Sequence, residues 1–173
     1  PEKNISSNLI YSLDIKSAKE SDLCVLAVPT HSLTDILHEL NDSNLKYLIL
    51  SKGFDLNTGL LPTELFNQKF NIDMNNIAVL SGPNHAEEII DDKSAATVIS
   101  STNEHYAKDL QTLFASKTFR VYTTNDILGV QIGGAIKNVI AIASGICTGL
   151  NLGDNTQAAL VSRGLNEMIE ISK

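Results

Sequence analysis

Apolar runs of strand length alternate with helical patterns as far as about residue 124, and only helical patterns follow. Three of the runs are almost continuously apolar, which is typical of strands covered on both faces of a parallel sheet. The run nearest the helical part alternates instead and predicts an edge strand. The predicted strands are a weak one at 8–12 and stronger ones at 22–29, 45–50, 76–83, 95–101 and 118–124.

Helical spacing of apolar residues fills the segments between these strands. The predicted helices are 31–40, 60–70, 85–91, 104–115, a long one that begins after residue 125 or 126, and 155–172. Asn84, Asn103 and either Asn125 or Asp126 are expected to cap the helices that follow them. Strands alternating with helices predict an α/β fold: a partial doubly wound, Rossmann-like parallel sheet in 1–124, followed by the start of an all-helical domain in 125–173.

A single cation lies within the long apolar segment Gly129–Gly149. Lys137 shares a helix face with Gly133 and Gly134, one turn earlier, and with apolar residues one turn later. We expect burial to lower the pKa of this lysine and make it usable as a general acid or base. The alternative is a lysine that reaches solvent from a packing helix. The two glycines cost helix stability, which indicates a close approach to the backbone.

Three consecutive strands are expected to end in residues suited to a binding site. The endings are Val28-Pro29-Thr30, Ser51-Lys52-Gly53 and Ser81-Gly82-Pro83-Asn84. Taken singly, each is also an ordinary turn sequence. Ligands of open parallel sheets bind beyond the carboxyl ends of the strands, so together the three endings predict a cleft that faces the helix carrying Lys137.

Composition narrows the partners. The chain has 13 Lys and Arg against 20 Asp and Glu, which gives a net charge of −7. No basic run indicates binding to nucleic acid or to an anionic membrane, so we expect the substrate to be a small molecule. Cys24 and Cys147 lie in apolar runs and predict buried free thiols of a reducing compartment, with a disulfide as the alternative. The four histidines are too scattered to predict a metal site. Residues 1–8 are polar and do not resemble a signal peptide, and we expect no apolar run to be long enough to span a membrane. These two features predict a cytoplasmic protein.

The sequence resembles the bacterial type of NAD(P)-dependent glycerol-3-phosphate dehydrogenase, with matching segments in the same order along nearly the whole chain. They are Val28-Pro-Thr, Leu50-Ser-Lys-Gly-Phe, Leu80-Ser-Gly-Pro-Asn-His-Ala-Glu-Glu, Phe119-Arg-Val-Tyr, Asp126, Gly129-Val-Gln-Ile-Gly-Gly-Ala-Ile-Lys-Asn and Ala158-Ala-Leu-Val-Ser-Arg-Gly-Leu-Asn-Glu. The resemblance implies reduction of dihydroxyacetone phosphate to sn-glycerol 3-phosphate with NADH or NADPH, which supplies phospholipid synthesis. A homodimer is one possible assembly.

The resemblance also implies residue roles. Lys137 would be the catalytic acid and base and would also bind the substrate. Lys52 would contact both substrate and cofactor. The remaining substrate-binding residues would be Gly82, Asn84 and Asn138, and the remaining cofactor-binding residues Pro29 and Ala86. Carbonyl reduction needs a proton donor and stabilisation of the developing alkoxide, which two lysines can supply.

The sequence departs from the family at both ends. It contains no Gly-x-Gly-x-x-Gly turn for a pyrophosphate, and it stops before the family's aspartate and Arg-Asn pair, so we expect a piece of a longer enzyme that is inactive by itself. Asp154 and Arg163 are interpreted as structural residues. Two alternatives remain: another β-hydroxyacid-type dehydrogenase, or a catalytically inert fragment or interaction module.

Overall fold

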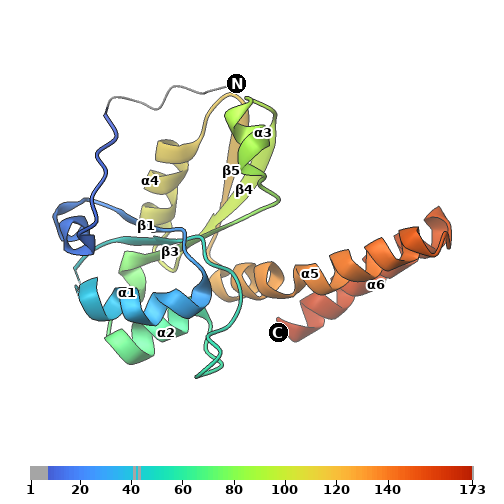
Figure 1. Ribbon diagram of the computed structural model, residues 1–173, viewed down its shortest axis with the longest axis horizontal. Helices are drawn as coiled ribbons and strands as arrows, with labels where there is room; N and C mark the ends of the chain where they lie inside the picture. The colour runs from blue at the N-terminus through green and yellow to red at the C-terminus, as the bar shows by residue number, and fades with distance from the viewer. Residues whose placement is uncertain (1–7, 41, 43, 173) are drawn as a thin grey trace.

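The computed structural model describes residues 8–40, 42 and 44–172, and Figure 1 shows their arrangement. A five-stranded sheet with helices on both faces is followed by two long helices. The elements are η1 (Ile15–Glu20), β1 (Cys24–Leu26), η2 (Thr30–Ser32), α1 (Leu33–Leu40), β2 (Tyr47–Ile49), α2 (Pro62–Phe70), η3 (Met74–Asn76), β3 (Ile77–Ser81), α3 (Ala86–Ile90), β4 (Ala95–Ser100), α4 (Glu104–Phe114), β5 (Phe119–Thr124), α5 (Ile127–Gly149) and α6 (Asp154–Ile171).

The sheet has the order β1-β2-β3-β4-β5 and is mostly parallel. β1, β2 and β3 are parallel, but β4 runs antiparallel to β3, and β5 is parallel to β4. The α/β prediction is therefore confirmed, whereas an entirely parallel sheet is not found. The segment 82–94 contains only the five-residue helix α3, which is too short to carry the chain back across the sheet, so β4 starts at the edge where β3 ends.

Two buried clusters hold helices against opposite faces of the sheet. Alternate strand residues face opposite sides, so Tyr47 and Ile49 meet α1 and α2 while Leu48 meets α4. The first turn of α5 joins the α1 and α2 side through Ile127. The helices on this side contribute Leu33, Leu37, Leu40, Leu65 and Phe66 to the core.

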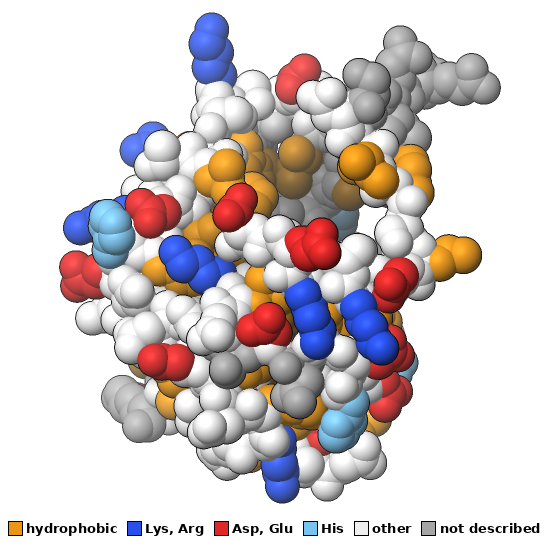
Figure 2. Space-filling model, turned by 90° about the vertical axis from the view of Figure 1, so that its left-hand side faces the viewer, with side chains coloured by type: hydrophobic (Ala, Val, Ile, Leu, Met, Phe, Trp, Pro, Cys, Tyr) orange, Lys and Arg blue, Asp and Glu red, His pale blue; other side chains and the backbone are white. Residues whose placement is uncertain are grey.

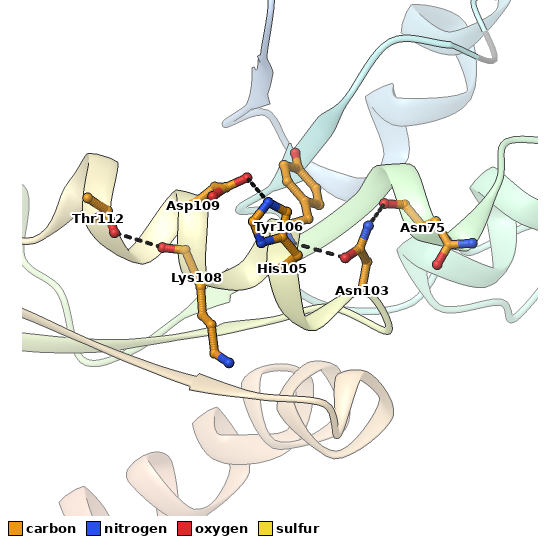
Figure 3. A network of polar contacts seen from close by, with 7 residues as sticks. All are labelled: Asn75, Asn103, His105, Tyr106, Lys108, Asp109 and Thr112. Carbon is orange, nitrogen blue, oxygen red and sulfur yellow. Dashed lines mark hydrogen bonds and ion pairs between the residues drawn. The ribbon is translucent and has the colours of Figure 1, made fainter.

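Helix α4 begins as the sequence predicts. The Asn103 side chain accepts a hydrogen bond from the Tyr106 N–H at 3.2 Å and donates one to the Asn75 carbonyl at 3.4 Å (Figure 3). The Tyr106 hydroxyl donates to the Tyr47 carbonyl at 3.1 Å and so ties α4 to β2. By contrast, the predicted cap Asn84 is wrong: His85 is the N-cap of α3, and its side chain makes no capping bond.

Helices α5 and α6 form a hairpin that projects from the sheet (Figure 1). They meet closely at Gly164, where a Cβ would lie 2.5 Å from the Cδ1 atom of Ile140. Contrary to our expectation, α5 is long and apolar enough to cross a membrane by length and composition alone, since Lys137 is its one charged residue. The same helix packs against β3 and α6, so the alternative is that it is a packing helix of the folded domain.

The predicted strand at 8–12 and the two cysteines can be compared with the described residues. Residues 9–12 form no strand, so the weak strand predicted at 8–12 is wrong, and the 3₁₀ helix η1 follows. Cys24 and Cys147 are both free and buried. The polar start lies outside the described residues as far as residue 7. On the face with α1 and η1, acidic and basic side chains are interspersed, without a patch of one sign among the coloured residues (Figure 2).

Candidate active site

The ends of β1 and β2 are joined by two side-chain hydrogen bonds. The Ser51 hydroxyl donates to the Val28 carbonyl at 2.6 Å, and the Thr30 hydroxyl donates to the Lys52 carbonyl at 2.7 Å. Gly53 follows with φ at +110°, a conformation that a side chain would strain. These bonds hold the backbone from which the Lys52 side chain leaves.

The end of β3 is too crowded at Gly82 for any side chain. A Cβ there would lie 2.7 Å from the Asn84 Oδ1, 2.8 Å from the Ala96 carbonyl oxygen and 2.9 Å from the Thr97 Cα. The half-buried Asn84 donates from Nδ2 to the same Ala96 carbonyl at 3.0 Å. Gly82 and Asn84 are thus locked onto the start of β4.

Lys52 reaches from β2 across the end of β3. Its Nζ donates to the Gly82 carbonyl at 3.5 Å, and its Cγ lies 3.6 Å from where a Cβ of Gly134 would be. Partial burial lowers the pKa of Lys52, and the neighbouring charge of Lys137 lowers it further. The charge of Lys137 can lower the pKa of Lys52 only if the two ammonium groups are near enough to repel each other, although they belong to different elements.

Lys137 lies on the exposed part of α5. Its Nζ donates to the Oδ1 of the neighbouring Asn138 at 3.1 Å, and both side chains are exposed. The expectation that the Lys137 ammonium is buried is therefore wrong. The helix leaves the sheet within the turn before Lys137, so the apolar neighbours in the sequence do not enclose the side chain.

The position of α5 depends on close contacts near its start. Asp126 caps the helix by accepting the Gly129 N–H at 2.8 Å, as one of the two sequence alternatives predicts. A Cβ at Gly134 would lie 3.0 Å from the Ser81 hydroxyl, which confirms the close approach expected there. At Gly133 the nearest atom, the Met168 Cε, would be 3.9 Å away, so ordinary helix packing suffices.

A buried amide contact that sequence reasoning missed also fixes α5. Gln131 exchanges hydrogen bonds with Thr63 at the start of α2, 68 residues earlier in the chain. The available signal was a lone amide on the inward face of an otherwise apolar helix. Its partner could not be named because Thr63 looks like any polar residue of a first helical turn.

Three of the sequence-predicted site residues are brought together by contacts: Lys52, Gly82 and Asn84. Lys137 lies one turn beyond Gly134, which the Lys52 stem approaches, and its charge lowers the pKa of Lys52. Asn138 joins them through Lys137, and Pro29 precedes the Thr30 that bonds Lys52. Ala86 is exposed at the start of α3 and has no described contact with the others. An apolar hollow of about 220 Å³ beside Gly82 is lined by Ser81, Gly82, Pro83, Ala96, Thr97, Val98 and Tyr122.

A second hollow, of about 280 Å³, lies away from both lysines. It is formed at the start of α4 and the end of β5, with Glu104, Lys108 and Asn125 in its wall. β5 ends at the opposite edge of the sheet from β3, because it is parallel to β4 and β4 is antiparallel to β3. Its lining does not include any of the predicted site residues, so the larger volume does not mark the site.

Two family models match the chain. The one for the N-terminus of NAD-dependent glycerol-3-phosphate dehydrogenase matches residues 1–107, and the one for its C-terminus matches 126–173. The chain belongs to this family. The glycerol-3-phosphate dehydrogenase [NAD(P)+] of Halothermothrix orenii is 41% identical over 172 residues, covering 97% of this chain and 50% of that protein. The Clostridium acetobutylicum enzyme of the same name is 41% identical over 159 residues, covering 90% and 47%.

Solved structures of glycerol-3-phosphate dehydrogenases share the fold. That from Coxiella burnetii has a TM-score of 0.80 at 30% identity and matches 91% of this chain and 49% of its own. DsGPDH of Dunaliella salina has a TM-score of 0.81 at 26% identity, over 92% and 28%. The sheet followed by helices is thus the glycerol-3-phosphate dehydrogenase fold. The chain spans about half the length of the curated relatives that it matches.

Proposed function

We propose that the protein interconverts dihydroxyacetone phosphate and sn-glycerol 3-phosphate by hydride transfer with NADH or NADPH. The observation that carries the proposal is that Lys52, beyond the carboxyl end of β2, bonds to Gly82 and packs its stem against Gly134 of α5, the helix that carries Lys137. The curated relatives bear the name glycerol-3-phosphate dehydrogenase [NAD(P)+], which supports this reaction.

Lys137 is the proton donor in this proposal. Reduction of the ketone adds hydride to the carbonyl carbon and a proton to its oxygen, and the carbonyl π electrons become the new O–H bond. The Lys137 ammonium supplies that proton and regains one from solvent, to which it is open. In the reverse direction its neutral amine takes the hydroxyl proton. Asn138 supports this step because its Oδ1 orients the Lys137 ammonium.

Lys52 stabilises charge at the same site. As hydride arrives, negative charge develops on the carbonyl oxygen, and a fixed cation close to it lowers the barrier. Its hydrogen bond to Gly82 and its stem packed against α5 restrict where its ammonium can go. The substrate phosphate adds negative charge that two lysines attract. Gly82 and Asn84 form the rigid wall on which the substrate rests.

The reacting end of the cofactor fits the open edge beside these groups. The dinucleotide supplies the hydride when bound. Pro29 and Ala86 are both exposed and small enough to let a flat ring approach, and Lys52 stands close to the Pro29-Thr30 turn through the Thr30 bond. In this proposal Pro29, Lys52 and Ala86 contact the nicotinamide end of the cofactor.

The proposal also covers the domain organisation, the cell compartment and the partners of the protein. Residues 1–124 contribute to the dinucleotide-binding domain and 125–173 open the helical substrate domain. We infer a cytoplasmic enzyme that supplies glycerol 3-phosphate for phospholipid synthesis, consistent with two buried free thiols. Its partner is a small phosphorylated substrate and neither nucleic acid nor membrane, and a homodimer is one possible assembly.

The test is turnover by the protein that contains this chain. Dihydroxyacetone phosphate should drive oxidation of NADH or NADPH, and Lys137→Ala should lower kcat by roughly 10²–10⁴-fold, the usual worth of a general acid. Lys108→Ala is the matched control, because Lys108 is an exposed lysine of α4 paired only weakly with Glu104 at 4.0 Å. It should keep kcat within about twofold.

Three outcomes would contradict parts of this proposal. Near wild-type turnover of Lys137→Ala would remove its catalytic role. Turnover of a β-hydroxy acid in place of glycerol 3-phosphate would favour the related dehydrogenases. Absence of turnover with either substrate by the purified protein would favour an inert interaction module.

A further inference from the structure

Gln131 is a buried amide in the first half of α5, and all of its polar atoms have partners. Its Oε1 accepts the Thr63 N–H at 3.1 Å. Its Nε2 donates to the Thr63 hydroxyl at 2.8 Å and to the Ile127 carbonyl at 3.1 Å. Gln131 is 5% exposed and Thr63 is 2% exposed, so water cannot replace either group.

The partner of Gln131 is a helix end that needs it. Thr63 is the second residue of α2, and the first N–H groups of a helix have no acceptor within the helix. The neighbouring Leu61 N–H is bound by the Glu64 carboxylate at 2.8 Å, which leaves the buried Thr63 N–H to α5. The contact therefore fixes one face of α5 on a particular atom of α2.

This contact lies upstream of the proposed proton donor on the same rigid element. Lys137 follows Gln131 by six residues, about 9 Å along the helix axis at about 1.5 Å per residue. Between them, Gly134 rests against Ser81 and the Lys52 stem. Beyond Gly134 the side of α5 away from α6 is open, with Val139 65% and Ile142 66% exposed. On that side few contacts hold the helix at Lys137, whereas on another side α6 packs against α5 at Ile140.

Rotation and depth of α5 decide where its long side chains point. A helix that turns about its axis carries Lys137 around with it, and the ammonium moves further than the backbone because it lies at the end of the side chain. A contact that resists rotation must be directional, and hydrogen bonds are directional whereas the apolar contacts of Ile127 are not. Gln131 supplies two such bonds to Thr63 of α2, whereas its third bond, to the Ile127 carbonyl, lies within α5.

We propose that Gln131 is a positioning residue: its bonds to Thr63 set the rotation and depth of α5 and thereby place Lys137 opposite Lys52. This role rests on the proposed function. Gln131 itself touches neither substrate nor cofactor in the proposal. It acts through Lys137, so its loss should lower kcat far more than it weakens cofactor binding.

The test compares four single variants and one double variant of the full-length protein. Gln131→Met keeps length and helix propensity and removes all three bonds; Thr63→Val removes the hydroxyl alone; Thr63→Ser keeps it. Ser101→Ala is the matched control, since its buried hydroxyl donates to the Ile77 carbonyl at 2.7 Å at the sheet edge away from both lysines. Each variant is assayed for kcat, KM for dihydroxyacetone phosphate, dissociation of the reduced cofactor and the urea midpoint.

We expect Gln131→Met to lower kcat at least tenfold with cofactor dissociation within twofold of wild type. Thr63→Val should lower kcat at least threefold, and Thr63→Ser should stay within twofold. The double variant Gln131→Met/Thr63→Val should be no slower than Gln131→Met alone, because both remove one interaction. Ser101→Ala should lower the urea midpoint and leave kcat unchanged.

A different pattern would overturn the role. If Gln131→Met lowers the urea midpoint as Ser101→Ala does but keeps kcat within twofold, the amide is structural only. If Gln131→Met does not fold, unchanged kcat in Thr63→Val overturns the role in the same way. A wild-type protein that does not turn over dihydroxyacetone phosphate would instead overturn the proposed function and, with it, the role of Gln131.

Discussion

The two parts of the molecule use apolar residues in opposite ways. In the sheet part, Leu33, Leu37 and Leu40 of α1 are completely buried. In the hairpin, Val139, Ile142 and Ile146 of α5 are each more than half exposed. Both helices are rich in aliphatic residues, so composition alone does not separate them. The sheet part is held by burial, whereas the hairpin depends on a few specific contacts.

Those contacts are concentrated at places where α5 meets another backbone closely. Near its start, Gln131 bonds to α2 and Gly134 rests on Ser81. Further along, Gly164 of α6 lies against Ile140, and the Gln157 amide donates to the Ser144 hydroxyl at 2.8 Å. The proposed proton donor lies between these two groups of contacts, on the part of α5 that is least covered.

The largest expected difference between the two parts comes from truncating one aliphatic side chain in each. Leu37→Ala removes a buried side chain and should lower the free energy of unfolding by about 2–5 kcal/mol. Ile142→Ala removes one that is 66% exposed and should change it by less than about 0.5 kcal/mol. Urea unfolding of both variants measures this. Equal losses would show that the face of α5 bearing Ile142 is covered in solution.

A pair of glycines tests the hairpin contacts at smaller scale. Gly164→Ala places a Cβ 2.5 to 3.0 Å from three side-chain atoms of Ile140, whose branching at Cβ limits its escape, so about 1–3 kcal/mol should be lost. Gly145→Ala meets nothing within 4 Å and should stabilise α5 by about 0.5–1 kcal/mol. Hydrogen exchange of the α5 and α6 amides reads both effects locally. Faster exchange in Gly145→Ala would contradict the open face at that position.

Sequence patterns predicted the elements better than their surroundings. Strand-length runs and caps such as Asn103 and Asp126 are local signals, and the structure has them. The antiparallel β4 was missed because strand direction depends on the length of α3, not on the strand's own residues. The exposure of Lys137 was missed for a similar reason, since an apolar sequence does not say where a helix leaves the sheet.

The candidate site was predicted residue by residue but not as a geometry. Lys52, Gly82 and Asn84 lie together at the end of β3, and the Lys52 stem lies against the helix that carries Lys137; the site and the role of each residue remain proposals. The Gln131 contact could not be predicted because it joins residues 68 apart through side chains that are individually ordinary. Long-range hydrogen bonds leave no periodic trace in a sequence, whereas buried faces do.

The most direct test of the two-lysine site is the pKa of Lys52 itself. Partial burial and the Lys137 charge hold the pKa of Lys52 below the ordinary lysine value of 10.5. Lys137→Met removes the second cause, and the pKa of Lys52 should rise; Lys108→Met should leave it unchanged. NMR titration of isotopically methylated lysines measures both. An upward shift in Lys137→Met supports a shared site for the two ammonium groups, and an unchanged pKa would contradict it.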